Sequence, residues 1–278
     1  MRHTGICILA VVWSACAPAA RRNNGAPDAA SSSDSSNPAS DANPGGDGGI
    51  GVVYVYAHTA STLYRVDPDT LAIQLVGNFG WPASVGSDSM TDIAIDKTGQ
   101  MIGVSFTRVF RVDPGTAQTT LLSSALQGTF NGLSFVPAAM LGQTGDDVLV
   151  GTRNSDGAVF RIDPMTGSAS QVGNMGGFQS SGDLVAVAGF GTVQTVMGAT
   201  NDRLARLAPT TFAATPIGTD TGYGQIWGIA YWKNKIYGFT DGGQFILIDP
   251  TTGAATLVST NSQQWWGAAV TTLAPVIQ

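Results

Sequence analysis

The chain has 278 residues, of which 43% are hydrophobic and only 12% are charged, and its formal net charge is −6. The basic residues are scattered singly, so the sequence offers no positive patch for a phosphate backbone and we expect no nucleic-acid partner. The 36 Gly and 13 Pro favour a turn-rich β protein over a helical one. All 19 acidic residues are Asp, which excludes enzyme mechanisms that need a Glu.

Residues 1–15 have the organisation of a secretory signal peptide. A short basic segment is followed by an apolar run at residues 6–13, which is too short to span a bilayer. Residues 13–16, Trp-Ser-Ala-Cys, resemble the lipobox of bacterial lipoproteins, with Trp13 in place of the usual aliphatic residue. That resemblance implies that Cys16 becomes the mature N-terminus and carries acyl chains such as palmitate. The alternative is ordinary signal-peptidase cleavage after residues 17–19, which would release a soluble exported protein.

The expected destination is therefore the cell envelope. The same resemblance to bacterial lipoproteins implies passage to the outer membrane, because Ala17 rather than Asp follows Cys16. The lipid bilayer would then be a partner through the acyl anchor. Residues 16–50 consist mostly of Ala, Ser, Asn, Asp, Pro and Gly, a composition that cannot offset the entropy of ordering. We expect a disordered tether there, and a folded domain over residues 51–278.

That domain contains one phrase five times, ending in Asp-Pro in four copies and Ala-Pro in the fourth. The copies are residues 63–68, 109–114, 159–164, 204–209 and 245–250. A period in the forties is the length that one four-stranded propeller blade requires. Each copy reads as a strand that runs into a tight turn, where Asp67, Asp113, Asp163 and Asp249 would accept backbone N–H groups.

The remaining strands complete five units. The strands nearest the axis are expected at residues 92–96, 132–136, 183–188, 228–232 and 267–271. The last of these has no strands after it, and the first unit lacks an inner strand, so the C-terminal strand should close the ring. The sequence therefore predicts an all-β, five-bladed β-propeller with four-stranded blades. The repeats resemble those of bacterial NHL-like and YVTN-like propellers, and that resemblance specifies a blade and no particular activity.

Catalytic residues are scarce. The two Cys lie at positions 7 and 16, so the folded domain has no thiol and a single imidazole, on His58. It also has no Gly-x-Ser-x-Gly motif, and one His without Cys leaves no tetrahedral zinc set. We expect no resident cofactor and interpret the chain as a non-catalytic protein. The alternative from another class is an Asp-dependent lyase or hydrolase.

The loops at one face of the propeller carry aromatic rings beside amides and carboxylates, a mixture that suits a glycan or a protein hot spot. We take Trp81 and Trp265 as the best exposed candidates, and Trp227 and Trp266 as packing residues before inner strands. The candidate ligand-binding residues are Trp81, Trp265, Tyr223, Phe178, Arg153 and Asn154.

A second candidate site lies in the central channel. Asp92 and Asp183 align at the start of their inner strands, with Asn131 nearby, and calcium accepts oxygen ligands of this kind. Two carboxylates do not complete a calcium shell, and hydrogen-bonded channel residues are the alternative. The leading functional hypothesis is an envelope-anchored binding module for a glycan or a protein, and a structural subunit of an envelope complex is a further alternative.

Overall fold

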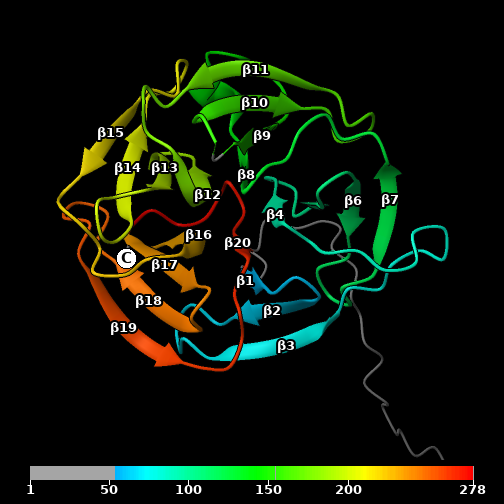
Figure 1. The fold of residues 1–278 in the computed structure, drawn as a ribbon, viewed down its shortest axis with the longest axis horizontal. Helices are drawn as coiled ribbons and strands as arrows, with labels where there is room; N and C mark the ends of the chain where they lie inside the picture. Colours follow the sequence, from blue (N-terminus) through cyan, green and yellow to red (C-terminus); the bar gives the residue numbers. More distant parts are fainter. Residues whose placement is uncertain (1–53, 154, 278) are drawn as a thin grey trace, which may run out of the picture. The chain divides into compact units, whose positions relative to one another are not determined.

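The computed structural model describes residues 54–153 and 155–277, which form five four-stranded antiparallel sheets arranged as blades around a central axis (Figure 1). This architecture confirms the predicted five-bladed β-propeller. The predicted signal peptide, Cys16 and the whole predicted tether lie outside the described residues. Within the described part of the chain, no helix is long and apolar enough to cross a membrane.

Each blade runs from an inner strand at the axis to an outer strand at the rim. The blades, listed from the axis outward, are β20 (Gly267–Ala269), β1 (Val55–His58), β2 (Thr62–Val66) and β3 (Ile73–Asn78); β4 (Asp92–Ile95), β5 (Met101–Val104), β6 (Val109–Val112) and β7 (Thr119–Ser123); β8 (Gly132–Val136), β9 (Val148–Thr152), β10 (Ala158–Ile162) and β11 (Ala169–Asn174); β12 (Ser180–Val187), β13 (Gly191–Val196), β14 (Arg203–Leu207) and β15 (Ala214–Ile217); β16 (Ile226–Trp232), β17 (Lys235–Thr240), β18 (Gln244–Ile248) and β19 (Ala255–Thr260). One short 3₁₀ helix, η1 (Ala138–Leu141), follows β8.

The ring is closed by the C-terminal strand, as predicted. β20 pairs with β1 through Tyr56 opposite Ala269 and His58 opposite Gly267. This pairing supplies the inner strand that the first blade lacks, and it joins the two ends of the described chain. Closure of this kind covers the edge of β1 that would otherwise lie open toward the axis.

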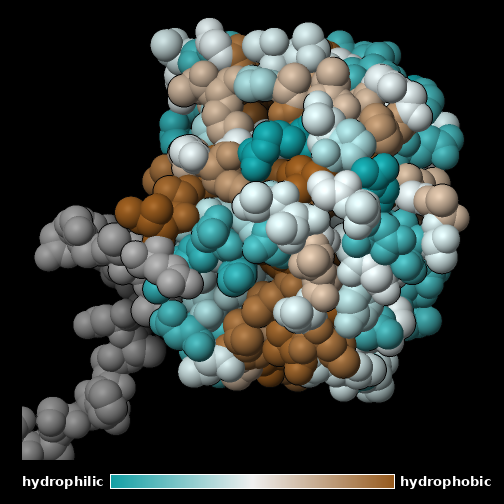
Figure 2. All heavy atoms as spheres, turned by 90° about the vertical axis from the view of Figure 1, so that its left-hand side faces the viewer, coloured by the Kyte–Doolittle hydropathy of each residue, from teal (hydrophilic) through white to brown (hydrophobic). Residues whose placement is uncertain are grey.

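Burial follows the position of each strand within its blade. Every residue of β4 and β8 is buried, because inner strands are covered on both faces and therefore carry continuous apolar runs. The outer strand β3 leaves Leu75 exposed, and β19 leaves Leu257 exposed. Figure 2 shows the rim as a mixture of hydrophilic and hydrophobic residues, with one hydrophobic patch in the lower half of this side.

The repeated Asp-Pro turns behave as predicted. The carboxylate of Asp163 accepts the backbone N–H groups of Met165 at 2.8 Å and Thr166 at 3.2 Å. The equivalent Asp residues of the first, second and fifth copies accept the same pair of N–H groups, two and three residues further on, and these residues are Asp67, Asp113 and Asp249. Each carboxylate therefore fixes the turn between the third and fourth strands of its blade.

The segment after β20 crosses the end of the axis where the inner strands finish. Thr271 pairs with Ile95 of the second blade, and Ala188 of the fourth blade donates its N–H to Thr272 O at 2.9 Å. Lys233 of the fifth blade donates to Pro275 O at 2.8 Å. The C-terminal residues thus hold several blades together at this end, and the site described below lies at the opposite end.

Candidate binding site at the mouth of the central channel

The inner strands approach one another closely at the axis because three of them, β8, β16 and β20, carry glycine where a side chain would otherwise stand. A Cβ placed on Gly228 of β16 would lie 2.6 Å from the carbonyl carbon of Gly267 in β20. A Cβ on Gly267 would in turn collide with Asp92 and with His58. Backbone and a few polar side chains therefore fill the channel at this level.

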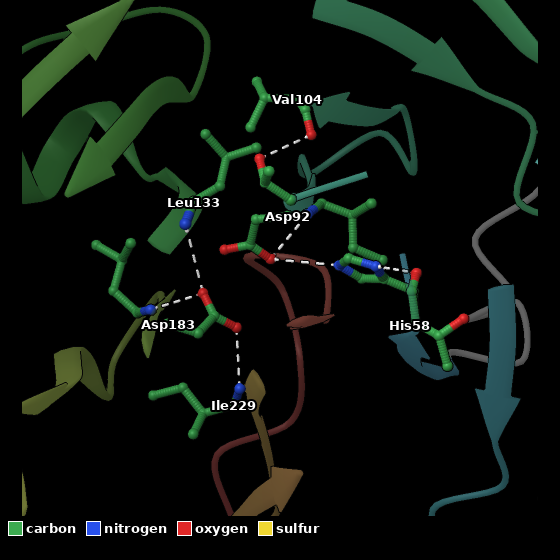
Figure 3. Close-up of polar contacts among 10 residues, drawn as sticks. His58, Asp92, Val104, Leu133, Asp183 and Ile229 are labelled. Carbon is green, nitrogen blue, oxygen red and sulfur yellow. Dashed lines mark hydrogen bonds and ion pairs between the residues drawn. The ribbon is translucent and has the colours of Figure 1, made fainter. Parts of the chain in front are cut away.

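Asp183 is the hub of these polar side chains. It is completely buried and accepts N–H hydrogen bonds from Leu184 at 2.6 Å, Ile229 at 2.9 Å and Leu133 at 3.4 Å (Figure 3). The three donors belong to the fourth, fifth and third blades. One carboxyl group thus links the inner strands of three neighbouring blades.

Asp92 lies beside Asp183 and is also completely buried. Its Oδ1 accepts the N–H of Ile93 at 2.8 Å, and its carboxyl group points toward that of Asp183 (Figure 3). Burial raises the pKa of both carboxyl groups, and the charge of Asp183 raises the pKa of Asp92 further. The N–H groups of Leu133, Leu184 and Ile229 oppose the rise in the pKa of Asp183, because they stabilise its charged form.

His58, the last residue of β1, completes this axial cluster. Its Nδ1 donates to the carbonyl oxygen of Thr59 at 2.9 Å, and its Nε2 lies 3.7 Å from Oδ1 of Asp92. Complete burial lowers the pKa of His58 to about 4, so the ring is neutral at pH 7. The contact with Asp92 is therefore not a charged pair, and His58 is a buried packing residue at the end of β1.

The axial cluster brings Asp92 and Asp183 together, but it does not favour the calcium site considered from the sequence. Backbone N–H groups occupy carboxylate oxygens of both residues, whereas calcium takes six to eight oxygen ligands. Among residues 54–153 and 155–277, no group of three or more His or Asp side chains is arranged to hold a metal ion. Asn131 is directed elsewhere, into the cavity that lies next to the cluster.

This cavity has a volume of about 510 Å³. Each blade contributes one residue at the same place in the repeat, directly before the first Asp or Gly that faces the axis. These five residues are Thr91, Asn131, Gly182, Trp227 and Trp266. The cavity is therefore centred on the propeller axis, at the mouth of the channel. The other lining residues are Phe106, Phe130, Ser181, Met197, Asp202 and Gln225.

Aromatic and apolar side chains are exposed around the channel mouth. The rings of Trp227 and Trp266 meet edge to face with centroids 6.5 Å apart. Phe106 is 54% exposed and Met197 is 48% exposed, although each is large and hydrophobic. Exposed hydrophobic side chains gathered at a concave site mark binding surfaces more often than structural ones.

Asp202 is the acidic residue of the cavity. Its Oδ2 accepts the N–H of Ile226 at 2.7 Å, which fixes the carboxylate at the start of the fifth inner strand. Burial raises the pKa of Asp202, and hydrogen bonds from Ser181 and Ile226 oppose that rise by stabilising the charged form. A partly desolvated carboxylate of this kind interacts strongly with a ligand that can donate a proton or carry a positive charge.

A larger groove, of about 570 Å³, lies along the third blade. It is lined by Arg161, Asp163 and Pro164 of the repeated phrase and by residues from the other strands and turns of the same blade. The Asp of the repeated phrase holds the turn in every copy that has one, so we interpret this groove as a consequence of blade geometry. The channel mouth differs, since its lining residues vary from blade to blade.

Trp265 requires a correction, because the structure leaves it 0% exposed. Its ring packs against Tyr64 at 5.1 Å and Phe239 at 5.4 Å between centroids. The aligned repeats contain a signal for this burial. In three other blades, the residue two positions before the inner-strand glycine or aspartate is also buried, and these residues are Met90, Phe130 and Ile226. The member of the Trp pair that lines the cavity is Trp266, which is half-buried and which the sequence analysis had assigned to packing.

The other candidate ligand residues that the structure describes do not line the cavity. Trp81 is partly buried, with its ring 5.0 Å from that of Phe110. Arg153 forms an ion pair with Asp156 at 2.6 Å. Tyr223 and Phe178 pack partly buried against two hydrophobic clusters, and Asn154 lies outside the described residues. The cavity is not lined by any of those described.

Comparison with known proteins gives the fold alone. No family model matches this sequence, and no curated protein matches it. Among solved structures, a chain in the crystal structure of a nidogen/laminin complex is similar to it with a TM-score of 0.53 and 8% sequence identity, covering 78% of this chain and 98% of that chain. At that identity, the similarity shows a shared propeller architecture.

Proposed function

We propose that this chain is a non-catalytic binding module that takes its ligand at the mouth of the central channel. The observation that carries the proposal is the cavity of about 510 Å³, whose exposed aromatic rings surround a few fixed polar groups. Such a combination is typical of ligand sites, where apolar surface gives affinity and a few polar groups fix orientation. Both ligand classes expected from the sequence, a glycan or a protein, can place a group of this size in the cavity.

The burial of the axial carboxyl groups argues against the enzyme alternative. An Asp-dependent lyase or hydrolase requires its carboxyl groups to reach the substrate. Asp92 and Asp183 are both 0% exposed and lie behind the backbone of the inner strands. Both residues stabilise the packing of the blades against one another. The propeller fold by itself does not specify an activity.

Binding can be tested with the purified protein. Thermal shift against soluble oligosaccharides, peptidoglycan fragments and peptides identifies a ligand, since one that binds the native state raises the melting temperature. Calorimetry should then show that Trp227→Ala and Trp266→Ala each weaken binding by roughly tenfold or more. Leu257→Ala removes an exposed apolar side chain from the rim and serves as the control. Unchanged affinity in both Trp variants would contradict the proposed site, and a panel without any ligand would favour a structural subunit of an envelope complex.

We also propose that the domain is held at the envelope, in the outer membrane, through lipid on Cys16. The support for this is the lipobox-like sequence, the signal peptide before it and the tether-like composition behind it. Metabolic labelling with palmitate should mark the protein, and Cys16→Ser should abolish both labelling and membrane association. Ala17→Ser leaves the thiol in place and is the control. Release of unlabelled, soluble wild-type protein would instead indicate ordinary signal-peptidase cleavage.

A further inference from the structure

The charge of the channel mouth is entirely negative. Asp202 is the one ionisable side chain among the described lining residues, which include no Lys, Arg or His. Arg108, a cation in the nearby loop of the second blade, is already paired with Asp88 at 2.9 Å. A ligand group that bears negative charge would therefore meet an unpaired carboxylate and no cation, which is unfavourable in a partly desolvated site.

The layer behind the cavity also contributes no cation. Thr91 and Gly182 line the cavity and directly precede Asp92 and Asp183 in the chain. The only imidazole beside that carboxyl pair in the described cluster, on His58, is neutral at pH 7. The described cluster on the propeller axis thus places no positive charge behind the mouth that would repel a cationic ligand.

The aromatic rings favour the same kind of ligand. Phe106, Phe130, Trp227 and Trp266 all line the cavity, and Met197 adds a polarisable thioether. The faces of aromatic rings attract ammonium groups, most strongly those of Trp, and desolvation strengthens the attraction. A cavity that combines several rings with one carboxylate is the arrangement that recognises organic ammonium groups.

We propose that the channel mouth binds an alkylammonium group, held over the aromatic rings and paired with the carboxylate of Asp202. This inference rests on the proposed function, because it names the chemical group that the binding module accepts. It requires a cation on a small organic framework, and the cavity volume of about 510 Å³ is ample for one. An ammonium group can belong to a free small molecule, to an amino sugar or to a lysine side chain, and these sources share the chemistry that the site would read.

The decisive probe is choline, compared with 3,3-dimethylbutan-1-ol. The two molecules have nearly the same shape, but only choline is charged, so the comparison isolates the cation from the apolar surface. We expect choline to show saturable binding by calorimetry, and the neutral alcohol to bind about 3-fold to 30-fold more weakly. Methylamine, glucosamine and a lysine peptide then show which degree of substitution and which source the site prefers.

Variants assign the charge effect to Asp202. Asp202→Asn keeps an oxygen that can accept the N–H of Ile226, so the loop should remain folded, and choline affinity should fall roughly tenfold while that of the neutral alcohol stays the same. Asp146→Asn is the matched control, because it removes the same charge from a side chain that is 98% exposed and outside the cavity. Thermal unfolding of each variant verifies that the fold is intact.

The outcomes separate this inference from the proposed function. Equal binding of choline and the neutral alcohol, or choline binding that Asp202→Asn leaves unchanged, would overturn the ammonium inference. Binding of a neutral sugar that Trp227→Ala abolishes, together with no choline binding in the millimolar range, would also overturn it and leave the proposed site standing. Choline binding that survives both Trp227→Ala and Trp266→Ala would place the ammonium site elsewhere and contradict both.

Discussion

The aspartates of this protein fall into two sets that experience opposite environments. Asp67, Asp163 and Asp249 lie in exposed turns, where N–H donors of the following residues lower the pKa of each carboxyl group. Asp92 and Asp183 lie at the axis, where burial raises the pKa of each group despite the hydrogen bonds that it accepts. The same side chain therefore stabilises a charged turn at the rim and retains a proton at the centre.

This difference separates aspartates that stabilise one blade from aspartates that connect several blades. A turn aspartate acts within one blade, so its role recurs in every copy that keeps it and is visible in the sequence repeat. An axial aspartate acts between blades, and Asp183 alone binds the backbone of three of them. Unique residues at the start of the inner strands therefore decide how the ring is held together and what lines its mouth.

The largest loss of stability should follow from removing the carboxyl group of Asp183. Asp183→Ala leaves N–H groups of three blades without their acceptor and Asp92 without its partner, and it should lower the free energy of unfolding by about 3–5 kcal/mol. Chemical denaturation provides the measurement. Asp163→Ala removes one turn carboxylate at the rim and should be much milder, so equal losses for the two variants would show that the axis has no special role.

Close packing at the axis predicts the next largest effect. Gly228→Ala places a Cβ against the backbone of Gly267, which cannot move aside as a side chain can, and should destabilise the protein by about 2–3 kcal/mol. Gly224→Ala is the control, since a Cβ there would meet nothing within 4 Å. Similar melting temperatures for the two variants would contradict the close approach of β16 and β20.

Stability should also depend on pH in a way that Asp92 controls. The folded pKa of its carboxyl group is raised, so the folded state holds a proton that the unfolded chain releases above its ordinary pKa of about 4. The free energy of unfolding should therefore fall as pH rises from about 4 toward the folded pKa. Between pH 6.5 and 8, the folded state keeps His58 neutral, because its folded pKa is about 4. The unfolded imidazole, with its ordinary pKa of about 6.5, adds a small opposite change that the wild-type protein and an Asp92 variant share.

Asp92→Asn should remove part of this decline, because the amide keeps a donor toward Asp183 and has no proton to lose. We expect the wild-type protein to lose about 1–2 kcal/mol more than this variant between pH 6.5 and 8. Denaturant titrations at the two pH values measure the difference. A parallel decline in both proteins would mean that Asp92 is already ionised in the folded state.

The smallest effect should come from completing the turn set. The fourth copy has Ala208 where the other turns have Asp, and its backbone still makes the same turn, with Phe212 N donating to Ala208 O at 2.9 Å. Ala208→Asp should supply the missing acceptor for the following N–H groups and stabilise the protein by about 0.5 kcal/mol. A loss of stability in thermal unfolding would show that this turn differs from the others.

The repeat made most of the fold predictable. Period, turn chemistry and the unpaired strands at the two ends of the domain specified five blades and their closure by β20, because each depends on local sequence. Alignment of the copies also pointed to Asp92 and Asp183. The position of His58 beside them was not accessible, since it depends on how the first blade meets the second across the axis.

The lining of the mouth was predicted less well for a physical reason. Trp265 and Trp266 are adjacent and similar in sequence, but neighbouring residues of an extended chain point to opposite sides, so one is buried and the other lines the cavity. Loop composition alone does not reveal which side faces the axis. Phe106 and Met197, from loops of different blades, come together there only in the closed ring.

The most direct test of the central claim is to observe the tryptophan indole N–H signals by NMR while a ligand is added. If the ligand binds at the channel mouth, the signals of Trp227 and Trp266 should shift with saturation, whereas those of Trp81 and the buried Trp265 should remain in place. Shifts confined to Trp81, with Trp227 and Trp266 unmoved, would contradict the account and place the binding surface on the rim of the loop face.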